Sequence, residues 1–130
     1  MKKQSLPALK RKLQIVFNKF IRLRDKDKSC ISCGEFKDNK QAGHFYSVRM
    51  YDGLRFEELN AHGECVRCNL FDDMHLLNYA AHLPERIGIK NFEALEQKAR
   101  FYKQYGCRWS RTEIEEMIKE YNLKIKNLKQ

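Results

Sequence analysis

The sequence lacks any long apolar run. No segment approaches the roughly 18 consecutive apolar residues that a membrane-spanning helix needs. The first residues, MKKQSLPALKRKLQ, are basic and lack the apolar segment of a secretory signal. The chain also has no internal repeat and no low-complexity segment, which argues against solenoid and fibrous architectures. We therefore expect a protein of a reducing cytoplasm that has no membrane partner.

Basic residues outnumber acidic residues in this sequence. The 130 residues contain 26 Lys and Arg against 17 Asp and Glu, a net charge of +9. Residues 1–28 carry ten basic and two acidic side chains, residues 29–88 six and nine, and residues 89–130 ten and six. Basic flanks favour a polyanionic partner such as DNA, and an acidic centre suits a metal ion.

The N-terminal segment has the spacing of an amphipathic helix of about 20 residues. Its apolar positions recur at three- and four-residue steps: Leu9, Leu13, Val16, Phe17, Phe20 and Ile21. Its other face shows Lys10, Lys12, Lys19 and Arg22. These basic residues form either a solvated face or a face that follows DNA phosphates.

The rest of the chain predicts a hairpin followed by helices. The hairpin is expected around QAGHFYS and LRFEELNAH, with turn residues Tyr51 to Gly53 between them. NLFDDMHLLNYAAHL is expected to be helical, as is FEALEQKARFYKQY, with Asn91 as its N-cap and Gly106 beyond its end. Ser110 and Glu113 fit a capping box at the start of a last helix.

Four of the five cysteines form two Cys-x-x-Cys pairs, Cys30 with Cys33 and Cys65 with Cys68. Two such knuckles in a reducing compartment predict one tetrahedral zinc site made of four sulfurs. This zinc would be structural, because the protein fills every coordination position. The alternative is buried free thiols or disulfides. We expect Cys107, the remaining cysteine, to be a small core residue.

These elements give one domain over residues 1–130. Residues 1–28 form the basic helix, residues 29–88 the zinc-knuckle core, and residues 89–130 the C-terminal helices. The predicted fold class is α+β and mostly helical, with a small zinc-clamped hairpin and a following helix between N- and C-terminal helices.

Five segments, FNKFIRLRD, CISC, AGHF, LNAHGECVRCN and ERIG, occur in order between about residues 16 and 95. Together they resemble the phage lambda NinG (Rap) family of recombination nucleases. The knuckle core is also similar to the wider HNH, or ββα-metal, nucleases, in which two zinc knuckles often clamp a hairpin and a helix. The resemblance implies an endonuclease that cuts branched DNA, such as Holliday junctions and displacement loops, in the host cytoplasm.

The resemblance also implies three catalytic residues, His44, Asn60 and Asn69. In HNH nucleases a histidine closes the first strand, an asparagine lies five residues before the second knuckle, and a His or Asn follows its last cysteine. His44 is the expected general base, because imidazole titrates near neutral pH. Asn60 is expected to hold that ring or its strand. Asn69 would offer its amide oxygen to Mg²⁺ or Mn²⁺.

The sequence departs from the HNH pattern at Gly43, where these enzymes usually place an Asp or His metal ligand. The second ligand must then come from elsewhere. His62 is the first candidate, followed by Asp72 and Asp73 on the expected helix. His62 could instead bond to backbone within the hairpin.

Three further residues have an ordinary structural explanation that competes with a functional one. His75 and His82 fit a helix face better than a ligand set. Arg67, inside the second knuckle, is either a phosphate contact or a solvated side chain.

Two other functions compete with an endonuclease. One is a non-catalytic zinc module that recognises DNA structure, which Gly43 favours. The other is a protein-interaction domain whose basic helices bind acidic partners. The stripe near the C-terminus has coiled-coil spacing and could form a homodimer seam or pack on the N-terminal helix. It consists of Ile114, Ile118, Tyr121, Ile125 and Leu128.

Overall fold

The computed structural model describes residues 3–129. It begins with helix α1, Leu6–Arg24, in which Ser5 caps the N-terminus by accepting a hydrogen bond from the Ala8 amide. The predicted apolar face is confirmed, because Leu13, Phe17 and Ile21 are fully buried. The helix ends at Asp25, a buried carboxylate that binds the Arg24 guanidinium and the Gly63 amide.

The predicted hairpin is present but shorter than its sequence pattern. Strand β1, Gln41–His44, pairs antiparallel with β2, Ala61–Glu64, so that Gly43 lies opposite His62 and Gln41 opposite Glu64. Two short 3-10 turns, Asp52–Leu54 and Glu58–Asn60, occupy the connection between the strands. Paired residues point to the same face of a sheet, so Gly43, His62 and Glu64 share one face.

The helical region after the second knuckle is divided in two. A π-helical turn, Arg67–Phe71, precedes helix α2, His75–Ile87. The prediction of one continuous helix was wrong, because Asp72 is extended and its side chain accepts a hydrogen bond from the Met74 amide. This local side-chain bond competes with helical pairing.

Helix α3, Ile89–Tyr105, begins two residues before the predicted N-cap. Asn91 lies inside the helix, and its side-chain amide donates to the Ile87 carbonyl. Gly106 ends the helix as expected, with a positive φ of 71° that glycine adopts without strain. Helix α4, Arg111–Leu128, starts with the predicted capping box of Ser110 and Glu113.

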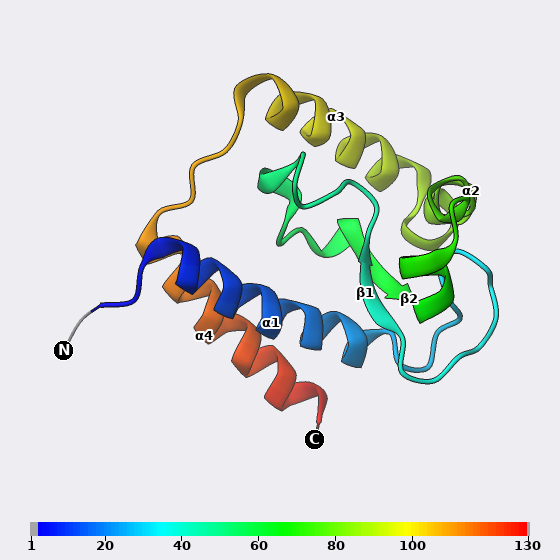
Figure 1. Cartoon of the computed structure of the whole chain (residues 1–130), viewed down its shortest axis with the longest axis horizontal. Helices are drawn as coiled ribbons and strands as arrows, with labels where there is room; N and C mark the ends of the chain where they lie inside the picture. Colours follow the sequence, from blue (N-terminus) through cyan, green and yellow to red (C-terminus); the bar gives the residue numbers. More distant parts are fainter. Residues whose placement is uncertain (1–2, 130) are drawn as a thin grey trace.

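The hairpin lies between two helical layers, with α1 and α4 on one side and α2 and α3 on the other (Figure 1). The first core includes Leu13, Phe17, Ile114 and Ala61. A second core lies around Ile31, Leu54, Tyr79, Leu83, Leu95 and Ala99. The mostly helical α+β architecture expected from the sequence is therefore confirmed.

Helices α1 and α4 run side by side in the same direction (Figure 1). Four members of the C-terminal stripe, Ile114, Ile118, Tyr121 and Ile125, are buried in the core shared with α1. This packing supports the intramolecular interpretation of that stripe, because these four side chains are covered within one chain. Leu128, the fifth member, is exposed.

Within the part of the chain described here, every helix is too short or too polar to cross a membrane.

Candidate metal centre and active site

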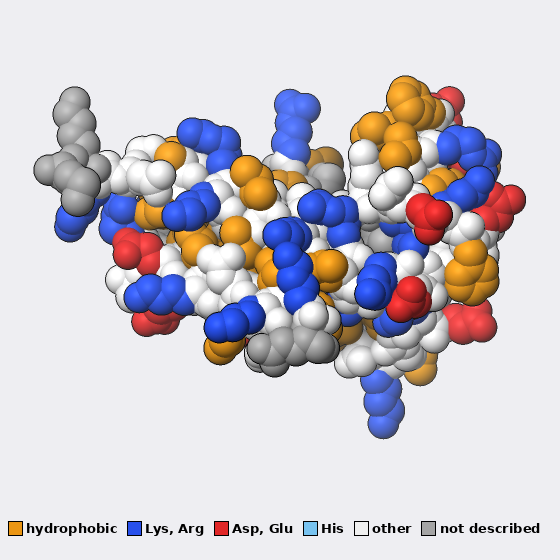
Figure 2. All heavy atoms as spheres, turned by 90° about the horizontal axis from the view of Figure 1, so that it is seen from below, with side chains coloured by type: hydrophobic (Ala, Val, Ile, Leu, Met, Phe, Trp, Pro, Cys, Tyr) orange, Lys and Arg blue, Asp and Glu red, His pale blue; other side chains and the backbone are white. Residues whose placement is uncertain are grey.

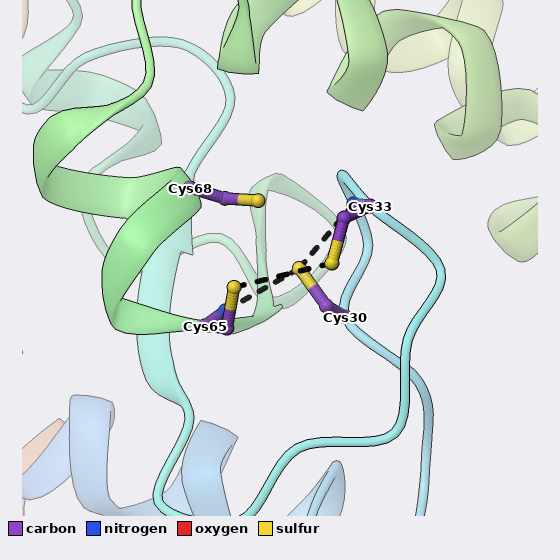
Figure 3. Close-up of side chains that lie close together, drawn as sticks. All are labelled: Cys30, Cys33, Cys65 and Cys68. Carbon is purple, nitrogen blue, oxygen red and sulfur yellow. Dashed lines mark hydrogen bonds between the residues drawn. The ribbon is translucent and has the colours of Figure 1, made fainter.

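The side chains of the two cysteine knuckles point toward one another (Figure 3). Cys30 and Cys33 come from the loop after α1, and Cys65 and Cys68 from the end of β2 and the turn that follows it. Their four sulfur atoms lie within 4.8 Å of one another. Four thiolates on a tetrahedral ion at 2.3 Å would lie about 3.8 Å apart. The cluster could therefore bind a metal ion such as zinc.

Backbone amides favour the thiolate form of Cys30, which is the form that binds a cation. Burial disfavours the thiolate of Cys30, but amide donors outweigh it and lower the pKa of this thiol. The amides of Cys33 and Cys65 approach the Cys30 sulfur at 3.5 and 3.3 Å. Burial raises the pKa of Cys68, so that thiol would ionise on binding the ion. Cys107 is only partly buried and lies apart from the cluster.

His44, at the end of β1, has the properties of a neutral proton acceptor. Its Nε2 lies 3.0 Å from the Arg55 carbonyl oxygen, which can only accept, so Nε2 carries the proton and Nδ1 the lone pair. Burial lowers the pKa of the ring, and the backbone carbonyls of Arg55 and Ala42 offset part of this effect. A histidine in this state can take a proton from water at neutral pH.

Asn60 braces the backbone around His44 and does not touch its ring. The buried Asn60 side chain accepts from the Tyr46 amide and donates to the carbonyls of Tyr46 and Leu54. It therefore fixes the chain just after His44 and just before Arg55. The sequence led us to expect that Asn60 holds the ring or its strand, whereas its side chain bonds to Tyr46, which follows the strand, and to Leu54.

One cavity of about 660 Å³ contains both His44 and Asn69 in its lining, together with His75 and the loop from Phe45 to Tyr51. Asn69 lies in the π-helical turn, and its Nδ2 donates to Gln41 Oε1 at 2.7 Å. That bond orients the amide, so its oxygen is the atom left to face a cation. Two of the three residues expected to act in catalysis thus share one cavity.

A family model described as the bacteriophage lambda NinG protein matches residues 1–130. The chain belongs to the NinG family. It is 38% identical to the NinG protein of Salmonella phage P22 and 35% identical to that of Escherichia phage lambda. Each alignment spans 117 residues, which is 89% of this chain and 55% of the relative. The chain thus spans about half the length of these relatives. No solved structure matches it.

The other candidate ligands of this NinG-family chain lie away from the cavity lining. His62 is buried in the core, where its Nδ1 donates to the Tyr79 hydroxyl oxygen at 3.2 Å. Burial, with a smaller contribution from Arg24, lowers the pKa of His62 to about 3. Asp72 caps the turn before α2, and Asp73 is exposed. The structure gives these residues structural or surface positions.

Two residues in this region were not selected from the sequence, Glu64 and His75. His75 is the first residue of α2, and its Nδ1 lies 3.0 Å from Glu64 Oε2. Glu64 is fully buried at the end of β2 and also accepts a hydrogen bond from the Ser32 hydroxyl. The sequence signal that could have identified Glu64 is a charged residue between an expected strand and a cysteine knuckle. His82, by contrast, donates to the Ile31 carbonyl in a structural contact.

The basic residues expected to contact DNA have different environments. Lys10 forms an ion pair with Asp52 at 3.0 Å, which ties α1 to the interstrand connection. Lys12, Lys19 and Arg22 are exposed on α1, and Arg67 is exposed on the knuckle. Lys and Arg side chains extend across the face formed by α1 and α4 (Figure 2). Repulsion from Lys129 lowers the pKa of Lys19, a sign of locally crowded positive charge.

Proposed function

We propose that this chain is a metal-dependent endonuclease that hydrolyses phosphodiester bonds in branched DNA, with zinc as its structural ion. The observation that carries the proposal is the shared cavity of His44 and Asn69, next to the four-cysteine cluster. The branched substrate follows the resemblance to recombination nucleases described above. Because the chain spans 55% of these relatives, the activity of the whole protein belongs to the same proposal.

The proposed chemistry assigns one task to each residue. Nδ1 of His44 takes a proton from water as the water oxygen bonds to phosphorus, the bond from phosphorus to the leaving sugar oxygen breaks, and that oxygen takes a proton from solvent water. Asn60 keeps the His44 segment in place. Asn69 Oδ1 would hold Mg²⁺ or Mn²⁺, which when bound stabilises negative charge on the phosphate.

Zinc fits the cysteine cluster on chemical grounds. Four thiolates are soft ligands, and a closed tetrahedral set is typical of structural zinc. The amides directed at the Cys30 sulfur are the outer contacts such thiolates commonly receive. The ion would join the loop after α1 to the turn after β2, and thereby fix Asn69 relative to the hairpin.

The basic helical face supports a DNA partner. The groove near the C-terminal end of α1 is lined by Lys19, Arg22, Lys26 and Lys40, with Asp38 as the acidic member. DNA phosphates would relieve the mutual repulsion of these cations and release counterions. We assign phosphate contacts to Lys12, Lys19, Arg22 and Arg67, and not to the paired Lys10.

The decisive experiment measures nicking of a labelled four-way junction in Mg²⁺ or Mn²⁺ by the wild type and by His44→Ala. Loss of a general base costs about 10²–10⁴ in rate while leaving junction affinity nearly unchanged, because the base acts on water. His82→Ala is the matched control, since His82 lies outside the cavity lining. Cutting by His44→Ala at the wild-type rate would refute the assignment.

A non-catalytic zinc module that recognises DNA structure is the second candidate. Gly43 favours it, because the residue directly before His44 has no side chain that could hold a metal ion. This candidate predicts junction binding without nicking by the wild-type protein in either metal. Affinity that falls steeply with salt on DNA but not on protein would favour this zinc module over a protein-interaction domain.

A further inference from the structure

We infer that His75 is the missing protein ligand of the active-site divalent ion, and that Glu64 positions it. This inference rests on the proposed function and supplies the ligand that Gly43 cannot. A neutral histidine with Nδ1–H donated to a buried carboxylate is a common arrangement for metal-binding imidazoles.

The ring of His75 has two distinct edges. Nδ1 faces Glu64 Oε2 at 3.0 Å, and a carboxylate oxygen accepts, so Nδ1 carries the proton. Nε2 then holds the lone pair. His75 lines the same cavity as His44 and Asn69, and Nε2 is the ring nitrogen that the bond to Glu64 leaves for a metal ion. His75 and Asn69 thereby bring an imidazole and an amide to the cavity that contains the proposed general base.

Glu64 is held from several directions. Its side chain is fully buried, and the Ser32 hydroxyl and His75 Nδ1 both donate to Oε2. Within residues 3–129, Oε1 has no hydrogen-bond partner although it is buried. Buried carboxylate oxygens normally have a hydrogen-bond partner, and a nearby cation is one way to stabilise such an oxygen without one. The inferred ion, held by His75, supplies that charge.

Gly43 belongs to the same arrangement. A Cβ atom added at residue 43 would collide with the Glu64 carboxylate and would lie 2.9 Å from Glu64 Cβ. Gly43 and Glu64 share one face of the hairpin, so the carboxyl group of β2 fills the space that a side chain on β1 would need. The absence of a side chain at Gly43 therefore leaves room for the Glu64 carboxylate. This carboxylate acts on the inferred ion through its hydrogen bond with His75.

The test is Mn²⁺ binding to the zinc-loaded full chain, followed by electron paramagnetic resonance and independent of cutting. We expect the wild type to bind one Mn²⁺ beyond its zinc, with nitrogen coupling from an imidazole ligand. His75→Ala should remove that coupling and weaken Mn²⁺ binding at least about tenfold, and Glu64→Gln should weaken it about 10- to 100-fold. His44→Ala should retain the coupling.

The matched control is Asp73→Asn, which makes the same carboxylate-to-amide change at an exposed position of the loop before α2. It should bind Mn²⁺ like the wild type. Zinc content and the thermal midpoint establish that each variant is folded. If His75→Ala does not fold, nitrogen-15 labelling of histidine in the wild type, with His44→Ala as background, still identifies the ligand.

Two results would overturn the inference: no Mn²⁺ binding by the wild type, with or without a junction, or unchanged nitrogen coupling in folded His75→Ala. The nuclease proposal fails by a different observation, namely a wild type that binds Mn²⁺ through His75 yet never nicks DNA. Nicking that requires His44 but not His75 would leave the nuclease proposal standing and remove this one.

Discussion

The two faces of the β1–β2 hairpin are built from different kinds of side chain. Towards α1, Ala42 and Ala61 contact the apolar core around Phe17. Towards α2, the hairpin presents His62 and Glu64, both buried and both hydrogen-bonded to side chains. The side towards α1 is closed by buried hydrocarbon, and the side towards α2 contains a polar network and the four-cysteine cluster within an apolar surround.

The apolar face of the hairpin serves as a scaffold, and the polar face positions the side chains of the proposed chemistry. Apolar packing is non-directional and tolerates small adjustments, so it can stabilise the fold without fixing any one atom. Buried polar groups must each find a partner at a set distance, so they orient side chains. The inferred metal-binding residues come from the polar layer, and His44 reaches the cavity from the end of the strand.

The largest effect on folding is expected from a substitution in the four-cysteine cluster. Cys65→Ser should abolish zinc binding and unfold the centre of the protein, because structural zinc contributes on the order of 10 kcal/mol. Elemental analysis and circular dichroism measure this, with Cys107→Ser as the control that keeps its zinc. A stable Cys65→Ser protein, together with no zinc in the wild type, would contradict the metal assignment.

The next effect concerns the apolar layer. Ile114→Ala should lower the free energy of unfolding by about 2–5 kcal/mol, because Ile114 is fully buried against α1. Leu128→Ala, at the exposed end of the stripe, should change it little. Urea unfolding at several protein concentrations distinguishes packing from dimerisation. A midpoint that rises with concentration would show that this chain associates, through a surface other than the α4 stripe.

A pH dependence should arise in the polar layer. The pKa of His62 is about 3 in the folded chain against an ordinary 6.5, so below pH 6.5 the unfolded chain binds a proton that the folded chain does not. The free energy of unfolding should therefore decrease as the pH is lowered, by up to about 1.4 kcal/mol per pH unit. Unfolding of wild type and His62→Gln between pH 7 and 5.5 tests this, and equal slopes would contradict it.

The smallest effect is expected at the surface of the apolar layer. Replacing Lys19 and Arg22 together by alanine should weaken junction binding modestly and reduce the salt slope by about two. Lys10→Ala should leave that slope nearly unchanged, because Lys10 is paired with Asp52. Fluorescence anisotropy at several salt concentrations measures both. An unchanged slope in the double variant would place the DNA on another face.

Local patterns accounted for much of this fold. The three- and four-residue spacing of α1, the capping box at Ser110 and the glycine after α3 depend on neighbours within one or two turns. The cysteine pairs are local as well, since two intervening residues bring both sulfurs to one turn. The break at Asp72 was missed because a side-chain hydrogen bond to the Met74 amide replaced helical pairing there.

The sequence by itself determined the helices at each end and the four thiols, because spacing along the chain fixes which side chains share a helix face or a turn. Only the tertiary structure decided which residues surround His44. Glu64 and His75 meet across 11 residues, and Asn69 and Gln41 across 28. Such contacts depend on strand register and on where α2 starts. Both are set by packing of the two layers around the hairpin, which no local pattern encodes.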